Sequence, residues 1–260
     1  MVAEAGAVSV PLAVLGSFGD ALDFIVRERE GPGGAQVGGT QLWDLLVVQL
    51  ELTAAAMAIA VAVALPAGLW LGHRRRGSFL VVTVANIGRA VPSIGLVFLF
   101  FAVLGAGFAN IMLALVVLAI PPILVNAYTG VRGVEEDVVD AARGVGMTGL
   151  EIVRRVELPL ALPLVAAGIR TSTVNVIATA TLGPEGGVVT LGDPIINPSS
   201  YGAEGRLGAA ILVAALAVAA EVALGAVERA VTPEGITTQA PRRGFLGLRF
   251  LPAKRRAQTT

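Results

Sequence analysis

The sequence is poor in the residues from which most active sites are built. It contains no cysteine and a single histidine, His73, which excludes disulfides and sites that need several thiolate or imidazole ligands. It also lacks a Gly-x-x-x-x-Gly-Lys-Ser/Thr motif, and so has no P-loop for ATP. Basic and acidic residues balance at 19 each, so no net charge indicates a nucleic-acid partner. These absences predict a chain that is not an enzyme and has no cofactor.

Charge is scarce as well, whereas apolar residues are abundant. Charged residues make up 15% of the chain, compared with about a quarter in soluble domains. Hydrophobic residues make up 55%, and the mean hydropathy is +0.79. Such a chain has too little polar surface to cover a soluble globule, so we expect an all-α integral membrane protein. Segments with the roughly 20 apolar residues needed to cross a bilayer are Leu52–Leu71, Phe79–Leu104, Phe108–Ala127, Leu160–Leu182 and Leu207–Val227. Pro92 should bend the second span, and Pro121-Pro122 should kink the third.

The distribution of lysine and arginine predicts the orientation. Most basic residues fall after the first span, between the third and fourth spans, or in the C-terminal tail. If those three regions are cytoplasmic, the opposite side holds only Arg27, Arg29 and Arg206, and the spans hold Arg89 and Arg170. This asymmetry follows the positive-inside rule, which places the segment between the third and fourth spans in the cytoplasm.

The two ends of the chain are predicted to flank a transmembrane domain of residues 45–230. In residues 1–44, Ala5–Gly16 is apolar but short, which favours a surface or re-entrant segment over a sixth span. Asp20–Glu30 is expected to form an amphipathic helix with Leu22, Phe24, Ile25 and Val26 facing inward. Gly31–Gly39, with its many glycines, predicts a flexible linker. The basic tail, residues 231–260, is predicted to be disordered and solvated; membrane lipid is the alternative partner.

The segment between the third and fourth spans has the local pattern of a helical hairpin. Acidic residues at 135–137 suit a helix N-terminus, and Gly144 and Gly146 suit its end. Thr148 and Glu151 have the spacing of a capping box, which predicts a second short helix that ends near Pro159. The first helix is expected to carry one apolar stripe, made by Val134, Val138, Ala141, Ala142 and Val145.

This hairpin carries a family resemblance. Asp140-Ala141-Ala142, followed by Gly146 and by Val156-x-Leu158-Pro159, resembles the "EAA" loop of ABC importer permeases, with Asp140 in place of the usual Glu and Val156 in place of the usual Ile. Further stretches are similar to osmoprotectant permeases for glycine betaine, choline or carnitine. These stretches are Val91-Pro92-Ser93-Ile94, Asn126–Val131, Ala141–Met147, Val156–Pro163 and Ala167–Thr171. The resemblance covers about residues 45–230.

The resemblance implies a small ABC importer permease fold with about five core helices, in the inner membrane of a bacterium. It further implies that ATP is hydrolysed by a dimer of separate ATPase subunits. Those subunits would dock on the hairpin at Asp140, Ala141, Ala142, Gly146, Leu158 and Pro159. The other implied partners are a second permease subunit, the same or related, and an extracytoplasmic substrate-binding protein.

Polar residues inside the predicted spans are candidates for the transport path. An arginine at the centre of a span costs about 2.5–3.5 kcal/mol on insertion scales, so it usually faces protein or water. In the fourth span, Thr171 and Asn175 share one helical face at i,i+4, whereas Arg170 lies on another. We expect Thr171 and Asn175 to line the pore, because a fixed cation would repel a quaternary ammonium cargo. Arg170 would then be structural, held by a carboxylate or carbonyls across the subunit interface. Arg89 is either structural or a pore charge, and packing alone remains the alternative for all four.

The cargo stays open at the level of sequence. No cluster of aromatic residues capable of holding a quaternary ammonium is visible, so recognition is expected in the binding protein. An importer of the same superfamily for an amino acid or a sulfur compound would share the hairpin. A secondary transporter or a membrane scaffold is the alternative from another class, favoured by an inverted repeat that the sequence does not show.

Overall fold

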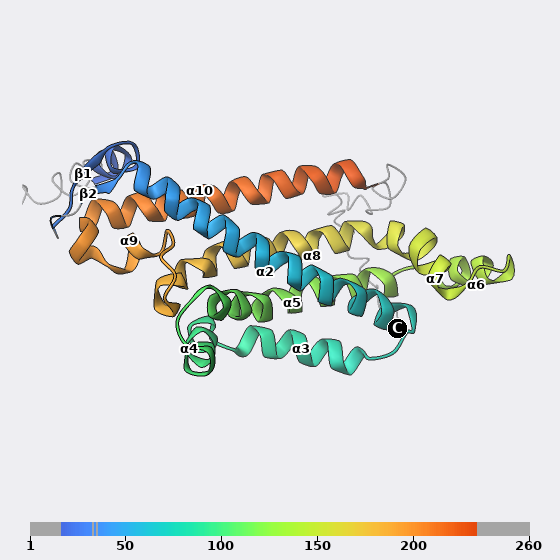
Figure 1. Ribbon diagram of the computed structural model, residues 1–260. Helices are drawn as coiled ribbons and strands as arrows, with labels where there is room; N and C mark the ends of the chain where they lie inside the picture. Colours follow the sequence, from blue (N-terminus) through green and yellow to red (C-terminus); the bar gives the residue numbers. More distant parts are fainter. Residues whose placement is uncertain (1–16, 33, 35, 233–260) are drawn as a thin grey trace, which may run out of the picture.

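The computed structural model describes residues 17–32, 34 and 36–232, and these form an elongated bundle of helices (Figure 1). The long helices are α2 (Thr40–His73), α3 (Ser78–Ala90), α4 (Ser93–Leu104), α5 (Phe108–Arg132), α8 (Leu158–Thr179) and α10 (Pro198–Val231). The shorter elements are β1 (Glu28–Glu30), β2 (Gln36–Gly38), α6 (Glu136–Gly144), α7 (Gly149–Ile152), the π-helix η1 (Val153–Glu157), the 3-10 helix η2 (Ala180–Gly186) and α9 (Asp193–Ile196).

The number of spans agrees with the prediction. In the described part of the chain, four helices are long and apolar enough to cross a membrane, and α3 with α4 makes up to a fifth. These two helices are bent by 91° at residues 91–92. Val91 is extended, with ψ of 122°, and Pro92 has no amide hydrogen to continue the ladder of α3. The predicted bend at Pro92 is therefore confirmed, and it is sharp enough for a broken span or a re-entrant loop.

Two predicted spans differ in detail from the helices observed. The first span begins at Thr40 rather than Leu52, so the expected domain boundary between residues 44 and 45 falls inside α2. The third span runs through Pro121 and Pro122 as one helix, α5. Proline residues are tolerated within such spans because neighbouring groups can satisfy the backbone carbonyls that lose a partner.

Glycine residues bring the central helices α2, α5 and α8 close together. A methyl group at Gly68 of α2 would lie 2.7 Å from the Ala127 Cβ of α5. Likewise, one at Gly130 of α5 would lie 2.9 Å from the Ala161 Cβ of α8. Larger side chains at either glycine would push the backbones apart, so these small residues set the close packing that holds α5 between its neighbours.

Residues 17–26 form a helix that packs on the start of α10. Phe24 is fully buried, and its ring lies against the positions of Gly205 and Gly208. The prediction that Leu22 and Val26 also face inward is wrong, because they are 55% and 77% exposed. Close contact with α10 involves the face carrying Ala21 and Phe24, and Leu22 and Val26 lie outside it. The predictions for Ala5–Gly16 and for the tail beyond residue 232 fall outside the described residues.

A short β-hairpin corrects the predicted linker. Strand β2 pairs with β1 in antiparallel register, with Arg29 opposite Val37. Val37 is buried in a small core with Phe24, Leu42 and Tyr201. The part of Gly31–Gly39 that forms β2 is therefore fixed to the bundle rather than free, because pairing and burial outweigh the flexibility that its glycines would give.

The bundle has two distinct ends. At one end lie α6, α7 and the end of α2, and at the other lie β1, β2, α4 and α9 (Figure 1). His73 and the arginines that follow it belong to the hairpin end, as do Arg143 and Arg154. Arg27 and Arg29 belong to the opposite end. The charge asymmetry seen in the sequence thus separates the two ends of the folded molecule, as the predicted orientation requires.

Candidate functional site

The hairpin folds as its local pattern predicts. Helix α6 ends at Gly144, and Gly146 has a φ of +88°, a conformation that glycine adopts without strain. The Thr148 hydroxyl accepts a hydrogen bond from the Glu151 backbone N–H, and the Glu151 carboxylate accepts one from the Thr148 N–H at 2.9 Å. Hydrogen bonds from the Thr148 backbone and hydroxyl hold the pKa of Glu151 below its usual value. The predicted end of the first helix at the glycines and the predicted capping box of the second are therefore both confirmed.

The apolar residues of α6 divide between two faces, not the single stripe predicted. Val139 and Ala142 are buried with Val134 against Ile152 of α7, and together they form the core of the hairpin. Val138, Ala141, Val145 and Leu150 are exposed instead, with Val145 at 80% and Leu150 at 62%. Once α7 packs on α6, only one face can be covered, and Val139 rather than Val138 lies on it. We call the exposed set the outer face of the hairpin.

An ion pair and a side-chain hydrogen bond connect the hairpin to the end of α2. Arg75 forms an ion pair with Glu136 of α6 and donates a hydrogen bond to the Val134 carbonyl at 3.2 Å. His73 Nδ1 lies 2.8 Å from Glu157 Oε2, and Glu157 is 3% exposed within η1. The second pair could not be predicted from local patterns, because its members are 84 residues apart. These contacts join the hairpin to the end of α2, and η1 continues directly into α8.

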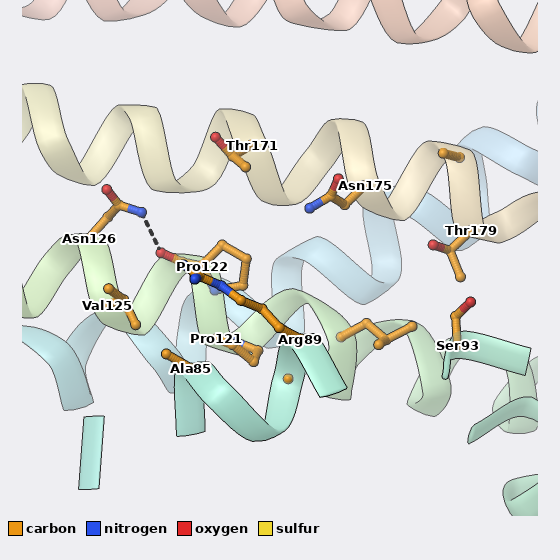
Figure 2. A pocket seen from close by; sticks show the side chains of 13 residues that line it. Ala85, Arg89, Ser93, Pro121, Pro122, Val125, Asn126, Thr171, Asn175 and Thr179 are labelled. Atoms are coloured by element: carbon orange, nitrogen blue, oxygen red, sulfur yellow. Dashed lines mark hydrogen bonds between the residues drawn. The ribbon is translucent and has the colours of Figure 1, made fainter. Parts of the chain in front are cut away.

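A cavity of about 410 Å3 lies between α3, α5 and α8. Its polar side chains are Arg89, Ser93, Asn126, Thr171, Asn175 and Thr179, and Figure 2 shows them around one space. The structure therefore brings Thr171 and Asn175 together with Arg89, which the sequence could not connect to them. Ser93 and Thr179 were not predicted. Ser93 follows a proline bend, and Thr179 ends α8, so polar residues at helix breaks were the available signal.

Arg170 is directed to a different place, between α8 and α10. Its Nη1 atom lies 3.4 Å from Glu221 and 3.6 Å from Glu228. Gly225 leaves room for the guanidinium, since a methyl group there would lie 3.3 Å from the same nitrogen. The expected carboxylate partner is thus present, but in the same chain and not across a subunit interface, because α10 packs directly on α8.

Comparison with known proteins identifies the family. Residues 64–233, more than half of the chain, match the family described as "Binding-protein-dependent transport system inner membrane component". The chain belongs to this family. It is a multi-pass inner-membrane permease of an ABC importer and not an enzyme, because ATP hydrolysis in such importers lies in a separate ATPase. An ATPase and a substrate-binding protein are its partners at the level of the family.

The permease also matches individual relatives over nearly their whole length. This chain is 37% identical over 202 residues to a glycine betaine/carnitine/choline transport system permease protein of Bacillus subtilis, and the match covers 77% of this chain and 93% of the relative. A choline transport system permease protein of the same organism matches with the same identity and coverage. A carnitine transport permease protein of Listeria monocytogenes is 37% identical over 75% of this chain and 88% of its own length.

Solved structures confirm the fold of the permease. A chain from the MetNI methionine ABC transporter in an inward-facing conformation matches with a TM-score of 0.66 and 24% identity. The match covers 74% of this permease and 96% of that chain. An amino acid ABC transporter solved with histidines matches with a TM-score of 0.57 and 19% identity, over 74% of this permease and 94% of that chain. At these identities the likeness shows the shared fold alone.

Proposed function

We propose that the permease carries an osmoprotectant such as glycine betaine, choline or carnitine into the cell. The observation that carries this proposal is the 37% identity, over 88–93% of their length, to relatives named for these compounds. The three cargos share a quaternary ammonium group. The likeness to methionine and other amino acid transporters concerns only the fold and does not favour an amino acid as cargo.

The outer face of the hairpin is the proposed docking surface for the ATPase. Its exposed apolar residues are Val138 and Ala141 of α6, Val145 at the end of that helix and Leu150 of α7, and none of them is covered in the described chain. Such a face fits a helix-in-groove contact. Asp140 and Ala141 would meet the ATPase directly, and Ala142 and Gly146 would set the shape of the hairpin. Leu158 and Pro159, at the start of α8, would pass its movement into the bundle.

We propose that the cavity between α3, α5 and α8 forms part of the transport path. Thr171 and Asn175 are exposed toward it in the single chain, while Ser172 between them is buried and donates a hydrogen bond to the Ala119 carbonyl of α5 at 2.8 Å. One face of α8 is thus packed, and the neighbouring face is left open. A second permease subunit would close this open side around a central pore. Two ATPase subunits would then switch the pore between inward-open and outward-open states by contacts that differ between the two.

Uptake of labelled glycine betaine tests both the cargo and the path. The permease would be expressed with its ATPase and binding protein in cells that lack other osmoprotectant uptake. We expect uptake by the wild type and a loss of roughly tenfold in Asn175→Leu, the effect of about one hydrogen bond of 1.4 kcal/mol. The substitution conserves size and should leave the assembled complex at wild-type yield.

Thr173→Val is the matched control for this experiment. The Thr173 hydroxyl bonds the Ile169 carbonyl of its own helix at 2.9 Å and lies outside the cavity, so uptake should stay near the wild-type level. Full activity of Asn175→Leu would show that Asn175 does not contact the cargo in the transport path. Absence of glycine betaine, choline and carnitine uptake by the wild type would contradict the proposed cargo.

A further inference from the structure

We propose that Arg89 selects the cargo by charge, so that the permease admits zwitterions bearing a carboxylate, such as glycine betaine or carnitine, and disfavours a pure cation such as choline. This inference rests on the proposed function and narrows its cargo class. It also assigns a role to a residue for which the sequence offered two alternatives, a structural charge or a pore charge.

Arg89 is the one charged residue among the 13 that line the cavity. The other polar groups there are hydroxyls and amides, which can donate hydrogen bonds to a carboxylate. No aspartate, glutamate or aromatic ring is part of the lining. A quaternary ammonium therefore finds in these walls neither an opposite charge nor the rings that cation–π binding needs.

Arg89 also has no counterion in the part of its chain that the structure describes. Within residues 17–32, 34 and 36–232, no ion pair or hydrogen bond holds its guanidinium. Arg170, the other arginine inside a span, has two carboxylates beside it. A fixed charge left without a partner in a membrane segment usually faces a hydrated path and serves function. Arg89 has this arrangement and Arg170 does not.

The position of Arg89 keeps its charge in the cavity. It lies in the last turn of α3, where the helix dipole favours a cation. Figure 2 shows its side chain extending from α3 toward Pro122 of α5, with Thr171 and Asn175 of α8 across the cavity. A carboxylate between these helices could accept hydrogen bonds from Arg89 and Asn175 together. The apolar lining, which includes Leu118 and Val125, would remain for the methyl groups of the ammonium.

The sign of the interaction decides between the cargos. Choline brings one positive charge into the field of Arg89, whereas glycine betaine brings a carboxylate that can approach the guanidinium while its ammonium points away. Away from bulk water, a unit charge several ångströms distant changes affinity by roughly tenfold or more. Arg89 should therefore set the ratio of glycine betaine to choline uptake, beyond any preference of the binding protein.

The test is the ratio of initial uptake rates for glycine betaine and choline in proteoliposomes containing the complete complex. One binding protein that carries both cargos is used for every variant, so its own preference cancels when ratios are compared. The wild-type ratio is the reference. Arg89→Gln should shift the ratio toward choline by roughly tenfold, and Arg89→Lys should stay close to the wild type. Arg76→Gln is the matched control, because Arg76 is exposed in the loop between α2 and α3 and should leave the ratio unchanged.

Several results would overturn the inference. One is an assembled Arg89→Gln complex with the wild-type ratio, and another is an Arg89→Gln complex whose ratio moves further toward glycine betaine. A lower yield of Arg89→Gln complex with an unchanged ratio in the remainder would assign Arg89 to a contact between permease subunits. If the wild type takes up neither cargo, the failure lies with the proposed function, and the inference that rests on it falls as well.

Discussion

At the scale of single residues, the two intramembrane arginines show what the sequence can and cannot predict. Sequence alone indicates that Arg89 and Arg170 each need a partner or a hydrated surface, because burying a lone cation is costly. It cannot say which of these each one has, since the partners of Arg170, Glu221 and Glu228, lie more than 50 residues away on α10. The shared face of Thr171 and Asn175 was predictable because helical spacing alone determines it.

Arg170→Ala should destabilise the permease. It would leave Glu221 and Glu228 of α10 without their cation, and the ion pairs that join α8 to α10 would be lost. Removing one partner of a fully buried pair costs about 3–5 kcal/mol, but these side chains are 22–49% exposed, so we expect about 1–2 kcal/mol. The yield and thermal unfolding midpoint of the purified permease would measure it. Arg170→Lys should recover much of the loss, and an unchanged midpoint in Arg170→Ala would contradict the structural role.

At the scale of elements, the hairpin was predictable in outline because its signals are local. The capping box and the helix-ending glycine each depend only on residues a few positions apart in the sequence. Which apolar residues face inward was not predictable, because Val138 and Val139 differ only in their relation to α7. The pair between His73 and Glu157 and the β1–β2 hairpin are long-range or packing-dependent features with no local pattern.

Two substitutions on α6 should separate docking from folding. Val145→Asp places a charge on the outer face, where the side chain is 80% exposed, so the hairpin should stay folded and lose the ATPase. Ala142→Asp buries an unpaired carboxylate beside Ile152, which costs several kcal/mol and should unfold the hairpin. Co-purification of the ATPase measures docking, and limited proteolysis measures folding.

Val189→Asp is the control for these two variants, because Val189 is 52% exposed at the opposite end of the bundle. It should neither release the ATPase nor raise the sensitivity of the hairpin to protease. Retention of the ATPase by Val145→Asp would show that the outer face is ordinary surface. A protease-resistant hairpin in Ala142→Asp would contradict the observed core.

At the scale of the whole molecule, hydropathy was sufficient to predict the number of spans, because each must supply a bilayer's thickness of apolar residues. The local break at Pro92 could also be predicted. Its 91° angle could not, because it depends on how α3 and α4 pack against α5, where Gly88 lies on Pro121. The segregation of arginine to the hairpin end then predicts that the hairpin faces the cytoplasm, where an ATPase has its ATP.

Cysteine labelling tests this central claim most directly, since the native chain has no cysteine to give background. Val145→Cys lies on the hairpin and Ala203→Cys near the opposite end, and both positions are exposed. In intact cells without the ATPase, an impermeant thiol reagent added outside should label Ala203→Cys and spare Val145→Cys. Permeabilised cells should label both. Labelling of Val145→Cys from outside in intact cells would place the hairpin on the wrong side of the membrane and contradict its role in coupling to the ATPase.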